Sequence, residues 1–232
     1  MNLDGATALV TGANRGFGRQ LAAQLLERGA TVYAGARSPE SIDLPGAEAI
    51  ALDITDPDSI AAAAAVASDV SLLVNNAGSN TWARLLDGEM SDIRLELETH
   101  LFGTLEVIRG FVPGMAARGG GAILNVLSAL SWFASTRFSA YSVAKSAEWG
   151  MSNALRLELA DRNIVVSALH VGFMDTDMIQ TIDAPKSDPA HIARIALDGV
   201  QDGAYEIVAD ETSRRVLAGL SGGVAALYPQ LP

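Results

Sequence analysis

Three side chains near the middle of the chain have the types and spacing that acid–base chemistry at a hydride-transfer site requires. Tyr141 and Lys145 lie four residues apart in a segment with helical apolar periodicity, so both project from one helix face. A phenol ordinarily has a pKa of about 10, and a neighbouring ammonium favours the phenolate. We therefore expect Lys145 to lower the pKa of Tyr141, so that Tyr141 can exchange a proton near neutral pH. Ser128 supplies a hydroxyl thirteen residues earlier.

A tyrosine–lysine pair on a solvated helix is the alternative interpretation. The chain has four tyrosines and two lysines, so random placement gives this spacing with a chance of about 0.03. That rate is too high for one motif to be trusted alone. The other motifs and the elements that carry them have to decide.

Strands and helices alternate along the chain. Apolar or β-branched runs predict strands near residues 6–12, 31–33, 47–54, 70–78, 122–128, 163–172 and 205–208. Helical patterns cover residues 16–28, 57–67, 91–117, the Tyr141 segment and 189–200, and Asp56-Pro57 and Asp188-Pro189 mark two helix starts. Continuous apolar strands alternating with helices indicate a parallel sheet covered on both faces. The sequence thus predicts one α/β domain over residues 1–232, with a doubly wound Rossmann-type sheet in three α/β/α layers.

Composition excludes several classes of function. A net charge of −11 argues against nucleic acid or an anionic membrane as partner. The chain has no cysteine, and its three histidines are too scattered to suggest a metal site. It has no apolar run of about 18 residues and no apparent secretion signal, so we expect a cytoplasmic protein.

A glycine-rich turn follows the first predicted strand and opens the first helix. Its glycines, Gly12, Gly16 and Gly18, would let a pyrophosphate approach the backbone and the positive end of the helix. The intervening residues Asn14, Arg15 and Phe17 belong to the same expected site. A tight structural turn without a ligand is the alternative.

The end of the second predicted strand bears on which dinucleotide would bind. NAD sites usually place a carboxylate there for the ribose hydroxyls, but this chain reads Ala34-Gly35-Ala36-Arg37. Arg37, together with Arg15 at a helix N-terminus, suits a 2′-phosphate. We therefore expect NADP(H), with two solvated arginines as the alternative.

Four motifs together resemble the short-chain dehydrogenase/reductase family, in its compact single-domain branch. They are TGANRGFG at 11–18, NNAG at 75–78, Ser128, and YSVAK at 141–145. The resemblance implies that Tyr141 donates or accepts a proton, that Lys145 binds the nicotinamide ribose and lowers the pKa of Tyr141, and that Ser128 holds the substrate oxygen.

The same resemblance extends the expected cofactor site. Asp53, followed by Ile54, looks like the family's adenine-contacting aspartate, and Thr176 resembles a threonine that contacts the carboxamide, near Gly172. The adenosine side would be lined by Asn75, Ala77 and Gly78. As alternatives, Asp53 could cap a loop, and Asn75 and Asn76 could form a strand-ending turn.

Three features depart from the family pattern. His100 stands where relatives usually have an asparagine that organises a relay water, and Val171 replaces a proline before Gly172. We expect His100 to take over the relay, with a packed core histidine as the alternative. The stretch between Thr181 and Asp188 is short where relatives often carry a lid.

These observations predict a carbonyl reductase or alcohol dehydrogenase that acts on a neutral, fairly apolar small molecule. Several apolar residues lie on segments expected around the reacting carbon: Trp82, Trp132, Phe133, Phe138, Phe173, Met174 and Met178. Two alternatives stay open, a non-enzymatic dinucleotide-binding sensor or scaffold, and another reaction on the same scaffold such as imine reduction or dehydration. The apolar helices near 99–117 and 141–160 also suggest a homodimer or homotetramer.

Overall fold

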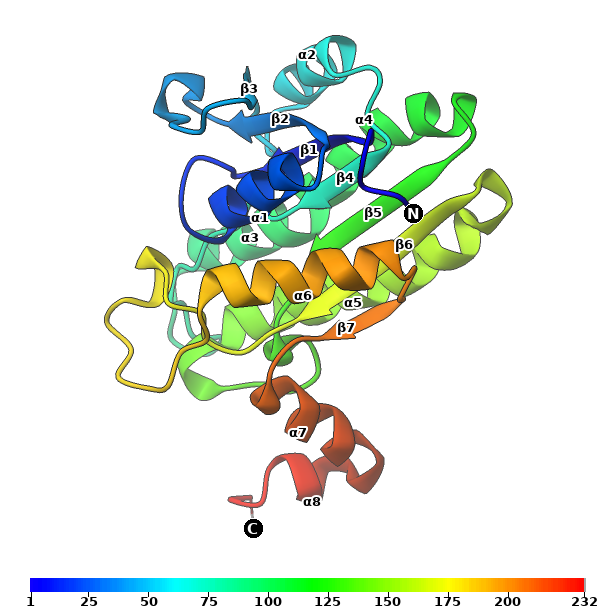
Figure 1. Cartoon of the computed structure of the whole chain (residues 1–232). Helices are drawn as coiled ribbons and strands as arrows, with labels where there is room; N and C mark the ends of the chain where they lie inside the picture. Colours follow the sequence, from blue (N-terminus) through cyan, green and yellow to red (C-terminus); the bar gives the residue numbers. More distant parts are fainter. Residues whose placement is uncertain (232) are drawn as a thin grey trace.

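A seven-stranded parallel sheet runs through the computed structural model, which describes residues 1–231 (Figure 1). The strand order is β3-β2-β1-β4-β5-β6-β7, and every neighbouring pair is parallel. The strands are β1 (Thr7–Thr11), β2 (Thr31–Ala36), β3 (Glu48–Ala51), β4 (Leu72–Asn75), β5 (Gly121–Val126), β6 (Ile164–His170) and β7 (Glu206–Val208). The doubly wound, Rossmann-type architecture predicted from the sequence is confirmed.

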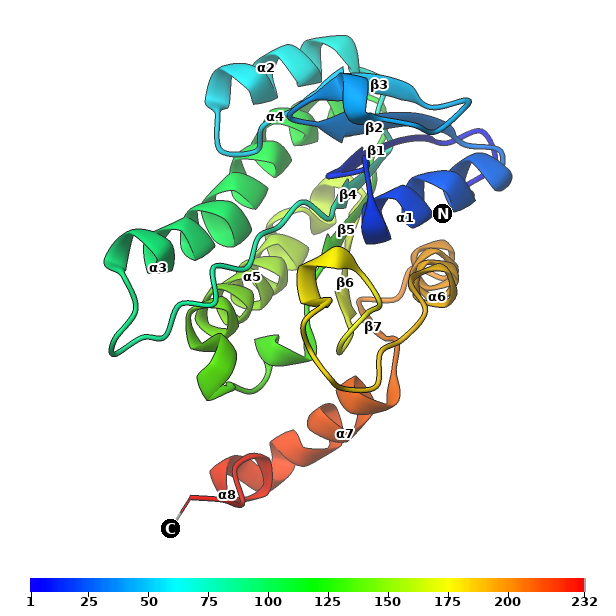
Figure 2. The ribbon, with the colours of Figure 1, turned by 90° about the vertical axis from the view of Figure 1, so that its left-hand side faces the viewer.

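Helices cover both faces of this sheet, as the continuous apolar strands require. On one face lie α1 (Gly16–Glu27) and α6 (Pro189–Gln201), whose buried leucines and isoleucines join one core cluster. On the other lie α2 (Pro57–Val66), α4 (Thr104–Ala117) and α5 (Ser139–Glu158) (Figure 2). The predicted caps are confirmed, because the Asp56 and Asp188 side chains accept from the backbone of Asp58 and Ala190.

The strand order places a crevice where the functional motifs meet. The chain runs outward from β1 to β3, then returns to place β4 on the other side of β1. Loops leaving β1 and β4 therefore diverge at the carboxyl ends of these strands, which is where open α/β sheets bind ligands. All the motif-bearing loops emerge at this edge.

Two features of the chain differ from the sequence-based expectation. The helical stretch from 91 to 117 divides into α3 (Met90–Leu97), a π-helical turn η2 (Glu98–Gly103) and α4. After β7, the chain adds α7 (Glu211–Gly219) and α8 (Gly223–Leu227), which extend away from the sheet (Figure 1). The signal for α7 was available, since Asp210 caps it by accepting from the Ser213 backbone.

Large apolar side chains remain exposed on the helices expected to mediate self-association. Val143 and Leu157 on α5, and Phe102 on η2, are among the exposed residues. Homo-oligomerisation stays a prediction. No helix within residues 1–231 is both long enough and apolar enough to cross a bilayer.

A polar cluster ties the edge strand β7 to β6 and α5. Glu206 on β7 lies with Oε2 2.6 Å from His170 Nε2, and its Oε1 accepts from Arg156 and from the Trp149 indole. Burial raises the pKa of Glu206, but the hydrogen bonds from His170, Arg156 and Trp149 outweigh that effect and lower it. The cluster therefore stabilises the fold while Glu206 is ionised.

Glu206→Gln should destabilise the protein by about 2 kcal/mol near neutral pH, because it removes a charged acceptor. Because the pKa of Glu206 is lower in the folded state, its ionised carboxylate stabilises the folded protein at pH values above the ordinary glutamate pKa of 4.5. This stabilisation is lost as the pH falls through the pKa of the folded state. Chemical denaturation from pH 3 to 7 should show the two proteins converging at the acid end. Glu40→Gln, at an exposed position, is the control, and a constant difference across the range would contradict the ionic role.

Candidate active site

A cleft of about 720 Å³ opens at the carboxyl ends of the strands. It brings together loops from β1, β2, β3, β4, β5 and β6 with the first turns of α5. Of the catalytic and cofactor-binding residues expected from the sequence, those that line it are Gly12, Asn14, Arg15, Gly16, Phe17, Gly18, Arg37, Asp53, Ile54, Ala77, Gly78, His100, Ser128, Tyr141, Lys145, Gly172 and Thr176.

The glycine-rich turn has the geometry of a phosphate cradle. Gly12 and Gly16 have φ values of +65° and +53°, which side chains rarely adopt. A Cβ on Gly18 would lie 2.2 Å from the Gly12 carbonyl oxygen, so the backbone here is as close as two glycines permit. Arg15 is the N-cap residue of helix α1, and its side chain makes no capping hydrogen bond. The first backbone amides of the helix can therefore bind an anion.

The segment after β4 fixes this turn from the other side. Asn76 Nδ2 donates to the Thr11 and Gly12 carbonyl oxygens at 2.9 and 3.2 Å. The Thr11 hydroxyl accepts from the backbone amides of Asn76 and Ala77, both at 2.9 Å. The two motifs, distant in sequence, therefore form one rigid wall of the cleft.

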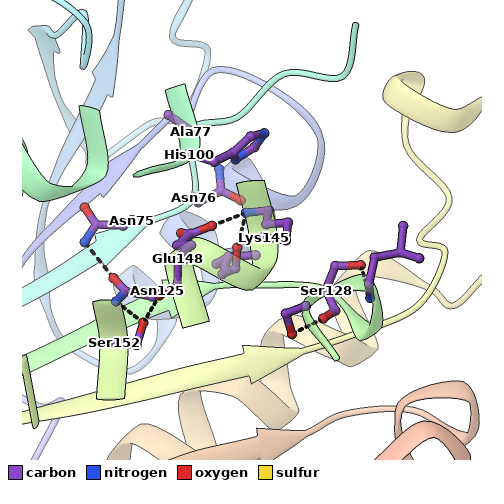
Figure 3. Close-up of polar contacts among 12 residues, drawn as sticks. Asn75, Asn76, Ala77, His100, Asn125, Ser128, Lys145, Glu148 and Ser152 are labelled. Atoms are coloured by element: carbon purple, nitrogen blue, oxygen red, sulfur yellow. Dashed lines mark hydrogen bonds and ion pairs between the residues drawn. The ribbon is translucent and has the colours of Figure 1, made fainter. Parts of the chain in front are cut away.

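The expectation for Asn75 is wrong with respect to its side chain. Asn75 is 4% exposed, and its Nδ2 donates to Asn125 Oδ1 at 2.9 Å, beneath the cleft (Figure 3). Alternation along β4 explains the difference, because successive side chains of a strand point to opposite sides. Asn76 lines the cleft instead.

Asp53 lies at the expected end of the cleft, and it also caps a turn. Its Oδ1 accepts from the Thr55 backbone at 2.9 Å and from the Thr55 hydroxyl at 2.8 Å. The Thr55 backbone bond lowers the pKa of Asp53, with a smaller contribution from Arg37. The capping alternative thus holds for one carboxylate oxygen, while the residue still lines the cleft.

The two arginines expected to favour a phosphate lie at the cleft rim. Arg37 is exposed, and Arg15 Nη1 lies 3.3 Å from Asp177 Oδ2 with both side chains more than two-thirds exposed. An exposed ion pair of this kind contributes little stability, so an incoming anion can replace the Asp177 carboxylate beside Arg15 at a small cost in free energy.

Tyr141 and Lys145 share one face of α5 above the sheet. Lys145 Nζ lies 5.8 Å from the centre of the Tyr141 ring. The same ammonium donates to the Val126 carbonyl at 2.8 Å and to Glu148 Oε2 at 2.7 Å. Because Lys145 is 5% exposed, it is held by the protein rather than by solvent.

The net effect on Tyr141 is opposite to the expected one. Burial raises its pKa most, Lys145 lowers it, Glu148 and Glu96 raise it, and a hydrogen bond with Ser128 lowers it. The sum lies above the ordinary phenol value of 10.0. Lys145 acts in the predicted direction, but burial and two carboxylates that sequence analysis missed outweigh it.

Ser128 is fixed by the turn that follows β5. Its hydroxyl accepts from the Leu130 amide at 3.1 Å, and its carbonyl accepts from the Ser131 hydroxyl at 2.6 Å. Ser131 in turn lies 2.9 Å from His170 Nδ1. The Glu206 cluster thus supports the loop that carries Ser128.

His100 lies beside Tyr141, on the π-helical turn η2. The two rings meet edge to face with centroids 5.1 Å apart. His100 Nε2 is 2.9 Å from the Ser79 carbonyl and 3.4 Å from Glu96 Oε2, whereas the buried Nδ1 has no partner within residues 1–231. The contact with the Ser79 carbonyl is what a packed core histidine would make. The position beside Tyr141 is what a role of His100 in the proton relay would require.

An apolar wall flanks Tyr141. The residues that pack together there are Leu130, Phe138, Ile179 and Ile182, with Trp82, Phe133 and Phe173 against them. Met174 and Met178 line the cleft as expected. Trp132 does not, since it stacks on His170 with centroids 3.6 Å apart.

The segment after β6 encloses one side of this wall although it is short. Ser187 donates its amide to the Phe173 carbonyl at 2.8 Å, which closes a compact loop. Ile179 and Ile182 on that loop pack against the apolar wall. A short connection therefore suffices to cover this part of the cleft.

Two buried carboxylates escaped the sequence analysis. Glu96 and Glu148 are 0% and 2% exposed. Their spacing was a usable signal, because Glu96 precedes His100 by four residues and Glu148 follows Lys145 by three, so each pair shares a helix face.

Comparisons with known proteins agree with this geometry. The family model described as short chain dehydrogenase matches residues 6–187. The 3-oxoacyl-[acyl-carrier-protein] reductase FabG of Vibrio cholerae is 35% identical over 196 residues, which cover 79% of each chain.

Two solved structures extend the comparison to the fold. A short chain dehydrogenase from Burkholderia cenocepacia, in complex with NADP, is 36% identical with a TM-score of 0.95, covering 100% of this chain and 99% of that one. A 7α-hydroxysteroid dehydrogenase complexed with NADH and 7-oxo glycochenodeoxycholic acid is 26% identical with a TM-score of 0.81, covering 89% of this chain and 94% of that one. From its motifs, fold and relatives together, the chain belongs to the short-chain dehydrogenase/reductase family.

Proposed function

We propose that this protein is an NADP(H)-dependent oxidoreductase that moves a hydride between nicotinamide and a carbonyl or alcohol substrate. The observation that carries the proposal is the convergence of Ser128, Tyr141 and Lys145 on the cleft that the glycine-rich turn also lines. A nucleotide-binding sensor or scaffold would need only the cradle. The rival explanation gives no role to the catalytic trio.

The cleft residues suit a dinucleotide with a 2′-phosphate. The close backbone approach at Gly12 and Gly18 and the uncapped start of α1 would hold the pyrophosphate. Arg37 and Arg15 would bind the 2′-phosphate, and Asp53 and Ile54 would contact the adenine end. The bound cofactor would supply or accept the hydride.

In the reductive direction, the chain's own groups act on the substrate oxygen. The Ser128 hydroxyl donates a hydrogen bond to that oxygen, and Tyr141 transfers its hydroxyl proton to it as the hydride adds to carbon. The raised pKa of Tyr141 keeps this proton in place at neutral pH. Lys145 stabilises the tyrosinate that results.

The apolar wall favours a neutral ketone or the matching alcohol. The exposed Arg137 lies over the Trp82 ring, 5.5 Å from its centre, and is not among the residues that line the cleft. The names of two relatives support a carbonyl substrate, because one is a 3-oxoacyl-[acyl-carrier-protein] reductase and the other is complexed with 7-oxo glycochenodeoxycholic acid. Both fit the reaction proposed, whereas imine reduction and dehydration have no specific support.

Tyr141→Phe should lower turnover by roughly 10² to 10⁴, because it removes the proton donor, while NADPH affinity changes only a few fold. Nicotinamide absorbance with a ketone panel measures turnover, and fluorescence titration measures binding. Tyr205→Phe, at a side chain 60% exposed, is the matched control. Near-normal turnover in Tyr141→Phe would sink the assignment.

Arg37→Asp should weaken NADPH binding by about tenfold or more and shift preference towards NADH, since it replaces a cation by an anion beside the phosphate. Calorimetry with both cofactors measures the change. Arg109→Asp, at an exposed residue on α4, controls for net charge. A preference of the unmodified protein for NADH would overturn the cofactor assignment.

His100→Asn should change the pH profile of turnover if the imidazole takes part in the proton relay. The limb that belongs to Tyr141 should remain. Profiles measured from pH 5 to 9 that superimpose would show that His100 only packs against Tyr141 and Ser79.

A further inference from the structure

Beneath the cleft, Lys145 forms an ion pair with Glu148, one helical turn along α5 (Figure 3). The two side chains are 6% and 2% exposed, and Nζ lies 2.7 Å from Oε2. The ammonium therefore sits between two fixed oxygen atoms, the Val126 carbonyl and the Glu148 carboxylate. Glu148 touches the catalytic lysine without lining the cleft.

A buried polar chain keeps this part of α5 in place. The Ser152 hydroxyl donates to the Glu148 carbonyl at 2.8 Å and accepts from Asn125 Nδ2 at 2.9 Å. Asn125 Oδ1 accepts from Asn75, so the chain reaches β4 and β5 (Figure 3). The helix turn that carries Glu148 is thus anchored to the sheet.

Burial makes each charge of the pair dependent on the other. An isolated carboxylate at this depth would cost several kcal/mol to ionise, and so would an isolated ammonium. Each is stable in its charged form because the other lies in contact. Tyr141 consequently faces a cation that a carboxylate already partly neutralises.

We propose that Glu148 is a positioning residue, which fixes the Lys145 ammonium and through its negative charge sets the proton affinity of the Tyr141–Lys145 pair. The proposal rests on the proposed function in that Tyr141 and Lys145 are taken as the catalytic groups. It gives the chain a built-in bias towards a protonated Tyr141.

The other ionisable groups around the pair are few within the described residues. Glu96 from α3 and His100 from η2 face Tyr141, whereas β5 contributes only Asn125 and a carbonyl. From β6, His170 is engaged with Ser131 and with Glu206 of β7. Several other charged side chains on neighbouring segments are exposed or engaged elsewhere. Arg137 lies over Trp82 and Arg156 pairs with Glu206, while the exposed ones are Arg94 on α3, Glu98 on η2, Glu158 on α5, and Asp161 and Arg162 beyond the end of α5.

Whichever of the two groups loses it, the first proton of the pair comes off at lower pH when a neighbouring negative charge is removed. Tyr141 and Lys145 interact strongly, so their titration belongs to the pair. Removing a negative charge from beside them weakens proton binding at both sites. Glu148→Gln should therefore make the pair release its proton at lower pH.

Glu148→Gln keeps the size of the side chain and an oxygen that can accept from Lys145. Tyrosinate absorbance of the ligand-free protein, with the Tyr141→Phe titration subtracted from each curve, reports the midpoint for Tyr141. Because the Val126 carbonyl and the glutamine oxygen still hold the Lys145 ammonium, we expect this midpoint to fall by about one pH unit. The pH at which ketone reduction declines on the alkaline side should shift downward by a similar amount.

Two further variants make the result decisive. Ser152→Ala removes the bond to the Glu148 main chain without altering charge, so its midpoint should match the unmodified protein. Glu148→Asp keeps the negative charge but moves it away from Lys145 Nζ, so its midpoint should lie between those of the unmodified protein and Glu148→Gln. If Glu148→Gln does not fold, the midpoint of Glu148→Asp alone tests the proposal. An unchanged midpoint in Glu148→Gln, or an equal fall in Ser152→Ala, would overturn the proposal.

The failure of the proposed function would look different. An unmodified protein that binds NADPH but reduces no ketone would count against that function. The absorbance titration needs neither cofactor nor substrate, so it would still report whether Glu148 sets the proton affinity of the pair.

Discussion

The Lys145 ammonium is the charge around which this site is built, because it must stay ionised at a position that solvent hardly reaches. Its two oxygen partners come from different elements, the Val126 carbonyl at the end of β5 and the Glu148 carboxylate on α5. Both contacts depend on α5 lying in one register against the sheet. A shift of the helix by one residue would leave a buried cation without partners, at a cost of several kcal/mol.

The sheet satisfies that constraint and positions the rest of the cleft. Parallel strands send every motif-bearing loop to one edge, so the glycine-rich turn, the Asn76 segment and the Ser128 loop converge there. Buried hydrogen bonds then fix each loop: Asn76 holds the Gly12 turn, and Ser131 holds the Ser128 carbonyl. Residues as far apart in the sequence as Gly12 and Ser128 thus act as one preorganised wall.

Much of this could be predicted from the sequence. Periodicity gave the order of strands and helices, and the Asp-Pro caps of α2 and α6 were readable because capping is a local interaction. Two predictions were wrong: that Asn75 lines the cleft with its side chain, and that the net effect on Tyr141 lowers its pKa. Both properties depend on contacts with residues far along the chain. Desolvation in particular cannot be judged until the fold shows what covers the phenol. Glu148 was within reach of a helical-face argument, but nothing local shows that it is buried.

Ser128, Tyr141 and Lys145 are proposed to direct a hydride between a nicotinamide and a carbonyl carbon. The most direct measurement follows the hydride itself, using NADPH that carries deuterium at the reactive carbon of the nicotinamide and a neutral aryl ketone as substrate. The account predicts an alcohol with one deuterium on its carbinol carbon, in an amount equal to the NADPH consumed. Tight binding of NADPH with no deuterated product from any carbonyl substrate offered would contradict it and favour a nucleotide-binding role.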